Sequence, residues 1–81
     1  MKQHLLFFSV LQDITGTAEL PWTCTPGAQV KDLLGTLYEH WPKLRDWDSS
    51  LLVAIDQTYV KREAPLTDNA EVAIMPPVQG G

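Results

Sequence analysis

Residues 30–41 read VKDLLGTLYEHW and decide the fold of this 81-residue chain. Their apolar side chains recur at i, i+3, i+4, i+7, i+8 and i+11, the spacing that is typical of an amphipathic helix. The residues of this stripe are Val30, Leu33, Leu34, Leu37, Tyr38 and Trp41. Pro42 ends the helix. An apolar stripe of this kind has to pack on a sheet, so the rest of the chain must supply strands.

Five other segments have the composition of strands. They are residues 4–11, 17–24, 51–55, 59–60 and 71–75. The first segment is a dense apolar run, which predicts a central strand buried on both faces. The second segment alternates at period two and contains Pro21, which suits an edge strand. The order of these segments around the helix predicts an α+β fold, with one helix across a mixed sheet of about five strands.

The connections between these segments are short and mostly polar. Residues 12–16 form a short turn that can be helical, and Gly16 stops it. Residues 43–50 form a polar connection from which Leu44 and Trp47 reach back to the core. Within it, Asp46 and Asp48 are interpreted as a solvated loop, and residues 61–63 are expected to be exposed.

Composition and charge narrow the class of protein. The length indicates one domain, and the net charge of −4 argues against a nucleic-acid partner, because phosphate binding needs clustered Lys and Arg. Cys24 is the single cysteine, so an intrachain disulfide is impossible and a reducing compartment is expected. Neither a signal peptide nor a membrane span is recognisable. We therefore expect a cytoplasmic protein that binds no membrane, with Cys24 as an inert packing residue.

Side chains that could carry chemistry are sparse. His4 and His40 have no Cys or carboxylate at ligand spacing, so we expect no metal site. Ser49 and Ser50 lack the G-x-S-x-G context of a nucleophile, and the glycines form no phosphate loop. We therefore expect a chain without catalytic machinery of its own.

The C-terminal stretch Pro76-Pro77-Val78-Gln79-Gly80-Gly81 has a distinct composition. Two successive prolines favour an extended course away from the body. Six extended residues reach roughly 20 Å, and glycine lacks the Cβ that would block a narrow channel. We therefore divide the chain into a body, residues 1–75, and a stalk, residues 76–81. A frayed end without a function remains the alternative.

Residues 65–81, PLTDNAEVAIMPPVQGG, resemble the closing signature of the MoaD family, the small subunits of molybdopterin synthase. The opening Leu6-Phe7-Phe8, the strand at 51–54 and the overall length also match. Asn69-Ala70 stands where the family usually has Gly-Asp, and Ile74-Met75 where aromatic residues often precede the prolines. The resemblance covers the whole chain and implies the ubiquitin-like β-grasp fold, which ThiS-like carriers share.

The resemblance implies a sulfur carrier that holds no cofactor. A MoeB-like adenylating enzyme would use ATP to activate Gly81, which would then become a thiocarboxylate. The stalk residues that would enter the partner are Pro76, Pro77, Val78, Gln79 and Gly80. A MoaE-like large subunit, expected in a heterotetramer, would receive the sulfur for the molybdopterin dithiolene. An apolar patch of Phe7, Tyr59 and Met75 would face this subunit, although by pattern alone these residues can equally be core.

Three other functions remain open at this point. A β-grasp carrier with the same ending could serve thiamine thiazole synthesis or tRNA thiolation. A ubiquitin-like modifier would instead join its terminal glycine to lysines. A plain interaction module would make no use of Gly80-Gly81.

Overall fold

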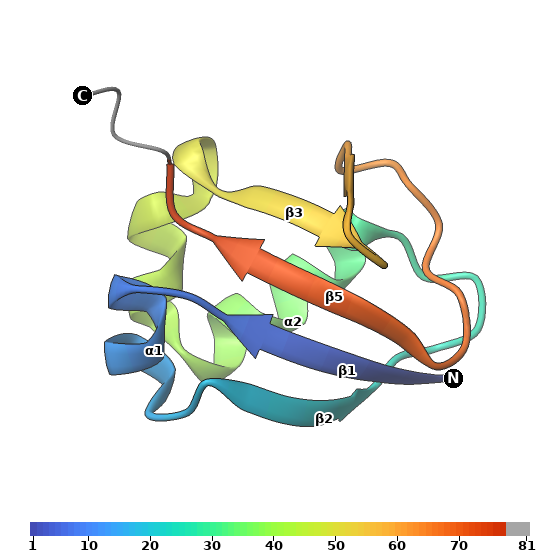
Figure 1. Ribbon diagram of the computed structural model, residues 1–81, viewed down its shortest axis with the longest axis horizontal. Helices are drawn as coiled ribbons and strands as arrows, with labels where there is room; N and C mark the ends of the chain where they lie inside the picture. The colour runs from blue at the N-terminus through green and yellow to red at the C-terminus, as the bar shows by residue number, and fades with distance from the viewer. Residues whose placement is uncertain (78–81) are drawn as a thin grey trace.

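The computed structural model describes residues 1–77 and contains one mixed sheet with helices on one side (Figure 1). Residues 78–81 lie outside the described part of the chain. The elements follow in the order β1 Lys2–Phe7, α1 Val10–Thr15, β2 Glu19–Thr23, α2 Val30–His40, the 3₁₀ helix η1 Pro42–Ser50, β3 Leu52–Ile55, β4 Thr58–Val60 and β5 Ala70–Met75.

The strands form a five-stranded sheet in the order β2-β1-β5-β3-β4. The two strands nearest the chain ends, β1 and β5, pair in parallel, and the other three pairs are antiparallel. Figure 1 shows α2 lying across one face of this sheet. This arrangement confirms the predicted α+β fold, and β2, which contains Pro21, is an edge strand as expected.

Helix α2 confirms the stripe seen in the sequence. Val30, Leu33, Leu34, Leu37 and Tyr38 are all buried against the sheet. The helix begins where the Asp32 carboxylate accepts the backbone N–H of Gln29 at 2.8 Å. This bond satisfies an amide group that the first turn leaves without a helical partner. The helix ends at His40, two residues before Pro42.

Strand β1 is shorter than predicted, and only one of its faces is buried. Leu5 and Phe7 point into the core, whereas His4 is exposed, because α2 covers only one side of the sheet. The prediction of a strand over residues 4–11, buried on both faces, is therefore wrong. The strand ends at Phe7, and Val10 already belongs to α1. Helix α1 then ends at Thr15, and Gly16 follows it with a φ of 79°, the left-handed conformation predicted for a stop.

The connection after α2 also differs from the prediction. It is the 3₁₀ helix η1, in which Leu44 is buried and Trp47 packs on the edge of the core, as expected. The prediction that Asp46 and Asp48 form a solvated loop holds, because Asp46 is exposed and the side chain of Asp48 is 49% exposed. The prediction that residues 61–63 are all exposed is wrong at Arg62, which is half-buried and pairs with Asp48 at 3.0 Å. Within residues 1–77, no helix is long and apolar enough to cross a membrane.

Candidate functional site

The described chain ends beside the middle of the sheet. Strand β5 lies between β1 and β3 and finishes at Met75, and Pro76 and Pro77 follow it in half-buried positions. The predicted site residues Val78, Gln79, Gly80 and Gly81 lie outside the described residues, so their roles stay predictions. What the structure places is the base of the stalk, on one of the inner strands of the sheet.

An open groove of about 540 Å³ lies at this base, and we call it the stalk groove. It is lined by Phe8, Ser9, Val10, Trp47, Met75, Pro76 and Pro77. One wall comes from the turn between β1 and α1, another comes from η1, and the stalk itself supplies the rest. Most of the lining is apolar, so the groove suits an apolar side chain of another protein.

The turn at Ser9 shapes one wall of the stalk groove. Ser9 has φ 54° and ψ −131°, and the N–H of Leu11 donates to the carbonyl oxygen of Phe8 at 3.1 Å. These angles are close to the first central position of a type II′ turn, which glycine usually occupies. A serine in this conformation is strained by roughly 1–3 kcal/mol, and such strain tends to occur at functional sites.

The sheet has a second apolar surface on the side away from α2, and we call it the outer face. Because side chains alternate along a strand, the cross-strand pairs identify its members. These members are Leu6, Leu52, Ala54, Tyr59, Ala73 and Met75. Tyr59 is 67% exposed, and Phe8, at the border with the stalk groove, is 42% exposed. Met75 belongs both to the outer face and to the lining of the stalk groove, so the two apolar surfaces are continuous there.

Of the three residues predicted to contact a partner, two belong to the outer face and one lies in the core. Tyr59 and Met75 belong to the outer face, as the prediction requires. Phe7 does not, because it is 1% exposed and packs edge-on against Trp41 at 5.9 Å between ring centres. Its prediction as a surface contact is wrong, and Phe8 is the aromatic residue that reaches the surface. The alternation of β1 could have shown this, since Leu5 and Phe7 share one face.

A polar cluster lies behind the wall formed by η1. Arg62 Nη1 donates to Asp48 Oδ1 at 3.0 Å, and Arg62 Nη2 donates to the carbonyl oxygen of the same aspartate at 2.5 Å. The hydroxyl of Tyr38 donates to Asp48 Oδ1 at 2.5 Å. These bonds lower the pKa of Asp48, with the Tyr38 hydroxyl as the largest cause. Burial and the same hydrogen bond raise the pKa of Tyr38.

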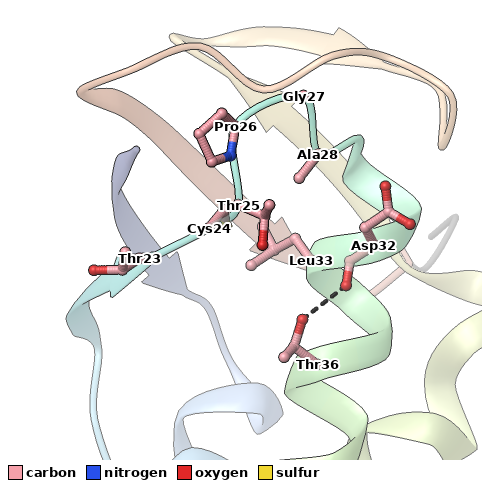
Figure 2. Close-up of a pocket in the computed structure, with 9 residues that line it drawn as sticks. All are labelled: Thr23, Cys24, Thr25, Pro26, Gly27, Ala28, Asp32, Leu33 and Thr36. Carbon is pink, nitrogen blue, oxygen red and sulfur yellow. Dashed lines mark hydrogen bonds between the residues drawn. The ribbon is translucent and has the colours of Figure 1, made fainter.

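A second hollow, of about 440 Å³, lies at the opposite end of the molecule near Cys24 (Figure 2). One of its hydroxyl groups bonds within the protein, since Thr36 Oγ1 donates to the Asp32 carbonyl at 2.7 Å. At the start of α2, the N–H groups of Val30 and Lys31 bond to backbone carbonyl oxygens. Burial also raises the pKa of the Cys24 thiol. The hollow therefore presents neither a free helix amide nor a reactive thiolate.

Metal ligands do not gather in the described part of the chain. No group of three or more His, Cys, Asp or Glu side chains lies together within residues 1–77. His4 Nε2 lies 2.9 Å from Glu19 Oε1, and the two side chains form an ion pair when the imidazole is protonated. Within residues 1–77, we take the stalk base and the adjoining outer face as the candidate binding surface, because exposed apolar side chains gather there.

Comparisons with known proteins cover nearly the whole chain. A family model described as the ThiS family matches residues 5–81. The molybdopterin synthase sulfur carrier subunit of Chlamydomonas reinhardtii is 33% identical over 84 residues, which cover all of both chains. The subunit of the same name from Escherichia coli K12 is 33% identical over 79 residues, covering 95% of this chain and 96% of that protein.

Solved structures confirm the ubiquitin-like β-grasp fold. Small archaeal modifier protein 1 of Methanosarcina acetivorans is 28% identical, with a TM-score of 0.80 and coverage of 99% of this chain and 96% of that one. A chain from the complex of subunits 1 and 2 of the molybdopterin-converting factor of Helicobacter pylori is 21% identical. Its TM-score is 0.69, with full coverage of both chains, and this likeness bears on the fold alone.

Proposed function

The chain belongs to the ThiS family, and we propose that it is the sulfur carrier subunit of a molybdopterin synthase. The full-length likeness to carrier subunits of that enzyme favours this pathway over thiamine thiazole synthesis and tRNA thiolation. One observation carries the proposal. The stalk leaves an inner strand beside an apolar groove, and the sequence then ends in Gly80-Gly81.

In this proposal Gly81 is the residue that reacts. A terminal carboxyl group has a pKa of about 3.3–3.7, so at neutral pH it is an anion and a poor electrophile. A MoeB-like adenylating enzyme overcomes this with ATP: a carboxylate oxygen of Gly81 attacks the α-phosphorus, and pyrophosphate leaves. A sulfur nucleophile then attacks the acyl carbon and displaces AMP. With hydrosulfide as this nucleophile, the loss of AMP leaves Gly81 as a thiocarboxylate without any change of oxidation state.

The other residues of the stalk allow Gly81 to reach the active sites of the partner proteins. Pro76 and Pro77 hold the chain in an extended course, because their rings fix φ. Val78 and Gln79 follow in the sequence, and Gly80, which lacks a Cβ, would fit a narrow channel. No residue after Glu71 has a titratable side chain, so the stalk brings no competing charge into a partner's active site.

The outer face and the stalk groove supply the docking surface in this proposal. A MoaE-like large subunit covers Phe8, Tyr59 and Met75 while the stalk enters its active site, and two carriers with two large subunits form the heterotetramer. The adenylating enzyme meets the same stalk in an earlier step. The carrier contributes a sulfur atom and contact surface, and its partners contribute the catalytic side chains and bind the ATP.

Intact mass spectrometry tests the proposal. The carrier is incubated with a MoeB-like enzyme, ATP and a sulfur source, and we expect a mass gain that matches the exchange of one oxygen for one sulfur. A variant with one alanine added after Gly81 should show no gain, although its circular dichroism is unchanged. An alanine added before Met1 is the matched control and should leave charging intact. Normal charging of the C-terminally extended chain would refute the assignment of Gly81.

The likeness to an archaeal modifier protein favours a second candidate function, in which the terminal glycine is joined to lysines. The two functions leave different products. Peptide mass spectrometry of proteins from cells would find a Gly-Gly remnant on target lysines if the chain is a modifier. A carrier dedicated to molybdopterin leaves no such remnant and restores molybdopterin formation with the large subunit.

A further inference from the structure

The wall of the stalk groove that comes from η1 has few internal supports. A 3₁₀ helix has poorer hydrogen-bond geometry than an α-helix and seldom exceeds four residues, yet η1 extends from Pro42 to Ser50. Leu44 is its single buried residue. Trp47, which lines the groove, is only partly buried. The position of Trp47 therefore depends on contacts that η1 makes with the rest of the protein.

Three hydrogen bonds from outside η1 reach Asp48, the residue next to Trp47. Arg62, which follows β4, donates to both the carboxylate and the carbonyl oxygen of Asp48. It also donates to the carbonyl oxygen of Leu51, at 3.4 Å, where η1 gives way to β3. The Tyr38 hydroxyl adds a bond from α2. Helix α2, through Tyr38, and the loop after β4, through Arg62, thus both hold the C-terminal half of η1 in place.

We propose that Asp48 and Arg62 are positioning residues that fix Trp47 as a wall of the stalk groove, so that the adenylating enzyme meets a preformed surface around Pro76 and Pro77. This inference rests on the proposed carrier function. The side chain of Asp48 is 49% exposed and that of Arg62 is 32% exposed. An exposed ion pair of this kind contributes little to the stability of the fold. It can still strengthen binding, because a groove that is already ordered costs less free energy to bind than one that becomes ordered on binding.

A double-mutant cycle tests this inference. The assay is ATP–pyrophosphate exchange by a MoeB-like enzyme, and the concentration of the carrier is varied to obtain its KM. We expect Asp48→Ala to raise KM about tenfold, a change that corresponds to roughly 1.4 kcal/mol of binding, with kcat nearly unchanged. In the background of Trp47→Leu, Asp48→Ala should have little further effect, because residues that act through one another are not additive. If Asp48→Ala does not fold, Asp48→Asn takes its place, with a smaller effect in the same direction.

Two control variants separate positioning from charge and from stability. Asp46→Ala removes an equal charge from an exposed residue of η1 and should leave KM unchanged. Leu20→Ala weakens β2 at the edge of the sheet and should lower the unfolding midpoint without raising KM. The inference is overturned if Asp48→Ala raises KM equally in both Trp47 backgrounds, if it changes KM in neither, or if Leu20→Ala raises KM as much.

An NMR measurement decides the matter independently of activity. The indole N–H resonance of Trp47 can be assigned by its absence in Trp47→Phe. Asp48→Ala should shift this resonance and the amide resonance of Met75, and Asp46→Ala should shift neither. If the wild-type carrier supports no exchange at all, the proposed function fails, yet the resonances still show whether Asp48 holds Trp47. Unshifted resonances in Asp48→Ala would refute the positioning role.

Discussion

Phe7 and Phe8 are neighbours in the chain, yet they point to opposite sides of the sheet. Phe7 is 1% exposed and packs against Trp41, and Phe8 is 42% exposed and lines the stalk groove. Successive side chains of an extended chain alternate in direction, and the turn at Ser9 begins only after Phe8. One aromatic residue thus stabilises the fold, and the next is available to a partner.

The first prediction concerns these two residues. Phe8→Ala should weaken binding to the large subunit by at least about tenfold, as expected for an aromatic anchor at an interface, and should change the free energy of unfolding by less than about 0.5 kcal/mol. Phe7→Ala should destabilise the protein by about 3–5 kcal/mol, because it leaves a cavity in the core. Calorimetric titration and urea unfolding measure the two effects. Equal losses of stability in the two variants would contradict the assignment.

The second prediction concerns strain at Ser9. Ser9→Gly should raise the free energy of unfolding by about 1 kcal/mol, because glycine adopts a positive φ without a steric penalty. Urea unfolding should show a higher midpoint with an unchanged slope. Ser49→Gly is the matched control, since Ser49 has no positive φ, and there glycine should give no gain. A destabilised Ser9→Gly variant would mean that the serine hydroxyl contributes more than the strain costs.

The third prediction concerns pH and Asp48. Its pKa in the folded protein lies below the ordinary value of 3.8, so its contribution to stability is complete above that value and is lost as the pH falls through the folded pKa. The difference in unfolding free energy between wild type and Asp48→Asn should thus be constant around neutral pH and shrink in strong acid. It should stay below about 1 kcal/mol, because the side chain is half exposed. Urea unfolding at pH 7 and pH 3 measures it, and a larger difference at pH 3 would contradict the sign.

The fourth prediction concerns Cys24. Burial raises the pKa of its thiol above the ordinary value of 9.0, and the thiolate is the form that reacts with alkylating agents. Iodoacetamide at neutral pH should therefore modify the native protein far more slowly than the urea-unfolded protein, as followed by intact mass. Equal rates in the two states would show that the thiol is accessible. A protected thiol is also compatible with the proposed carrier function, in which the reactive sulfur is on Gly81 and not on Cys24.

Several features of the fold and the site could be predicted from the sequence. The period of the stripe in residues 30–41 depends only on local geometry, and that stripe became the buried face of α2. Pro21 on an edge strand and Gly16 at a helix end follow from the backbone limits of single residues. The ending of the chain predicted the family, which the comparisons confirm. In each case the physical cause lies within a few neighbouring residues.

Other features depend on contacts between residues far apart in the sequence. Only the packing of α2 on one side of the sheet shows which face of β1 is buried, and so separates Phe7 from Phe8. The pairing of Asp48 with Arg62 joins residues 14 positions apart, and charged side chains give no sign of their partners in a single sequence. The stalk groove likewise exists because the parallel pairing of β1 and β5 brings the Ser9 turn to Met75, near the opposite end of the chain. Local geometry thus determined helix α2, the edge position of Pro21 and the stop at Gly16, because each depends on neighbouring residues. Long-range packing decided which side chains meet at the base of the stalk.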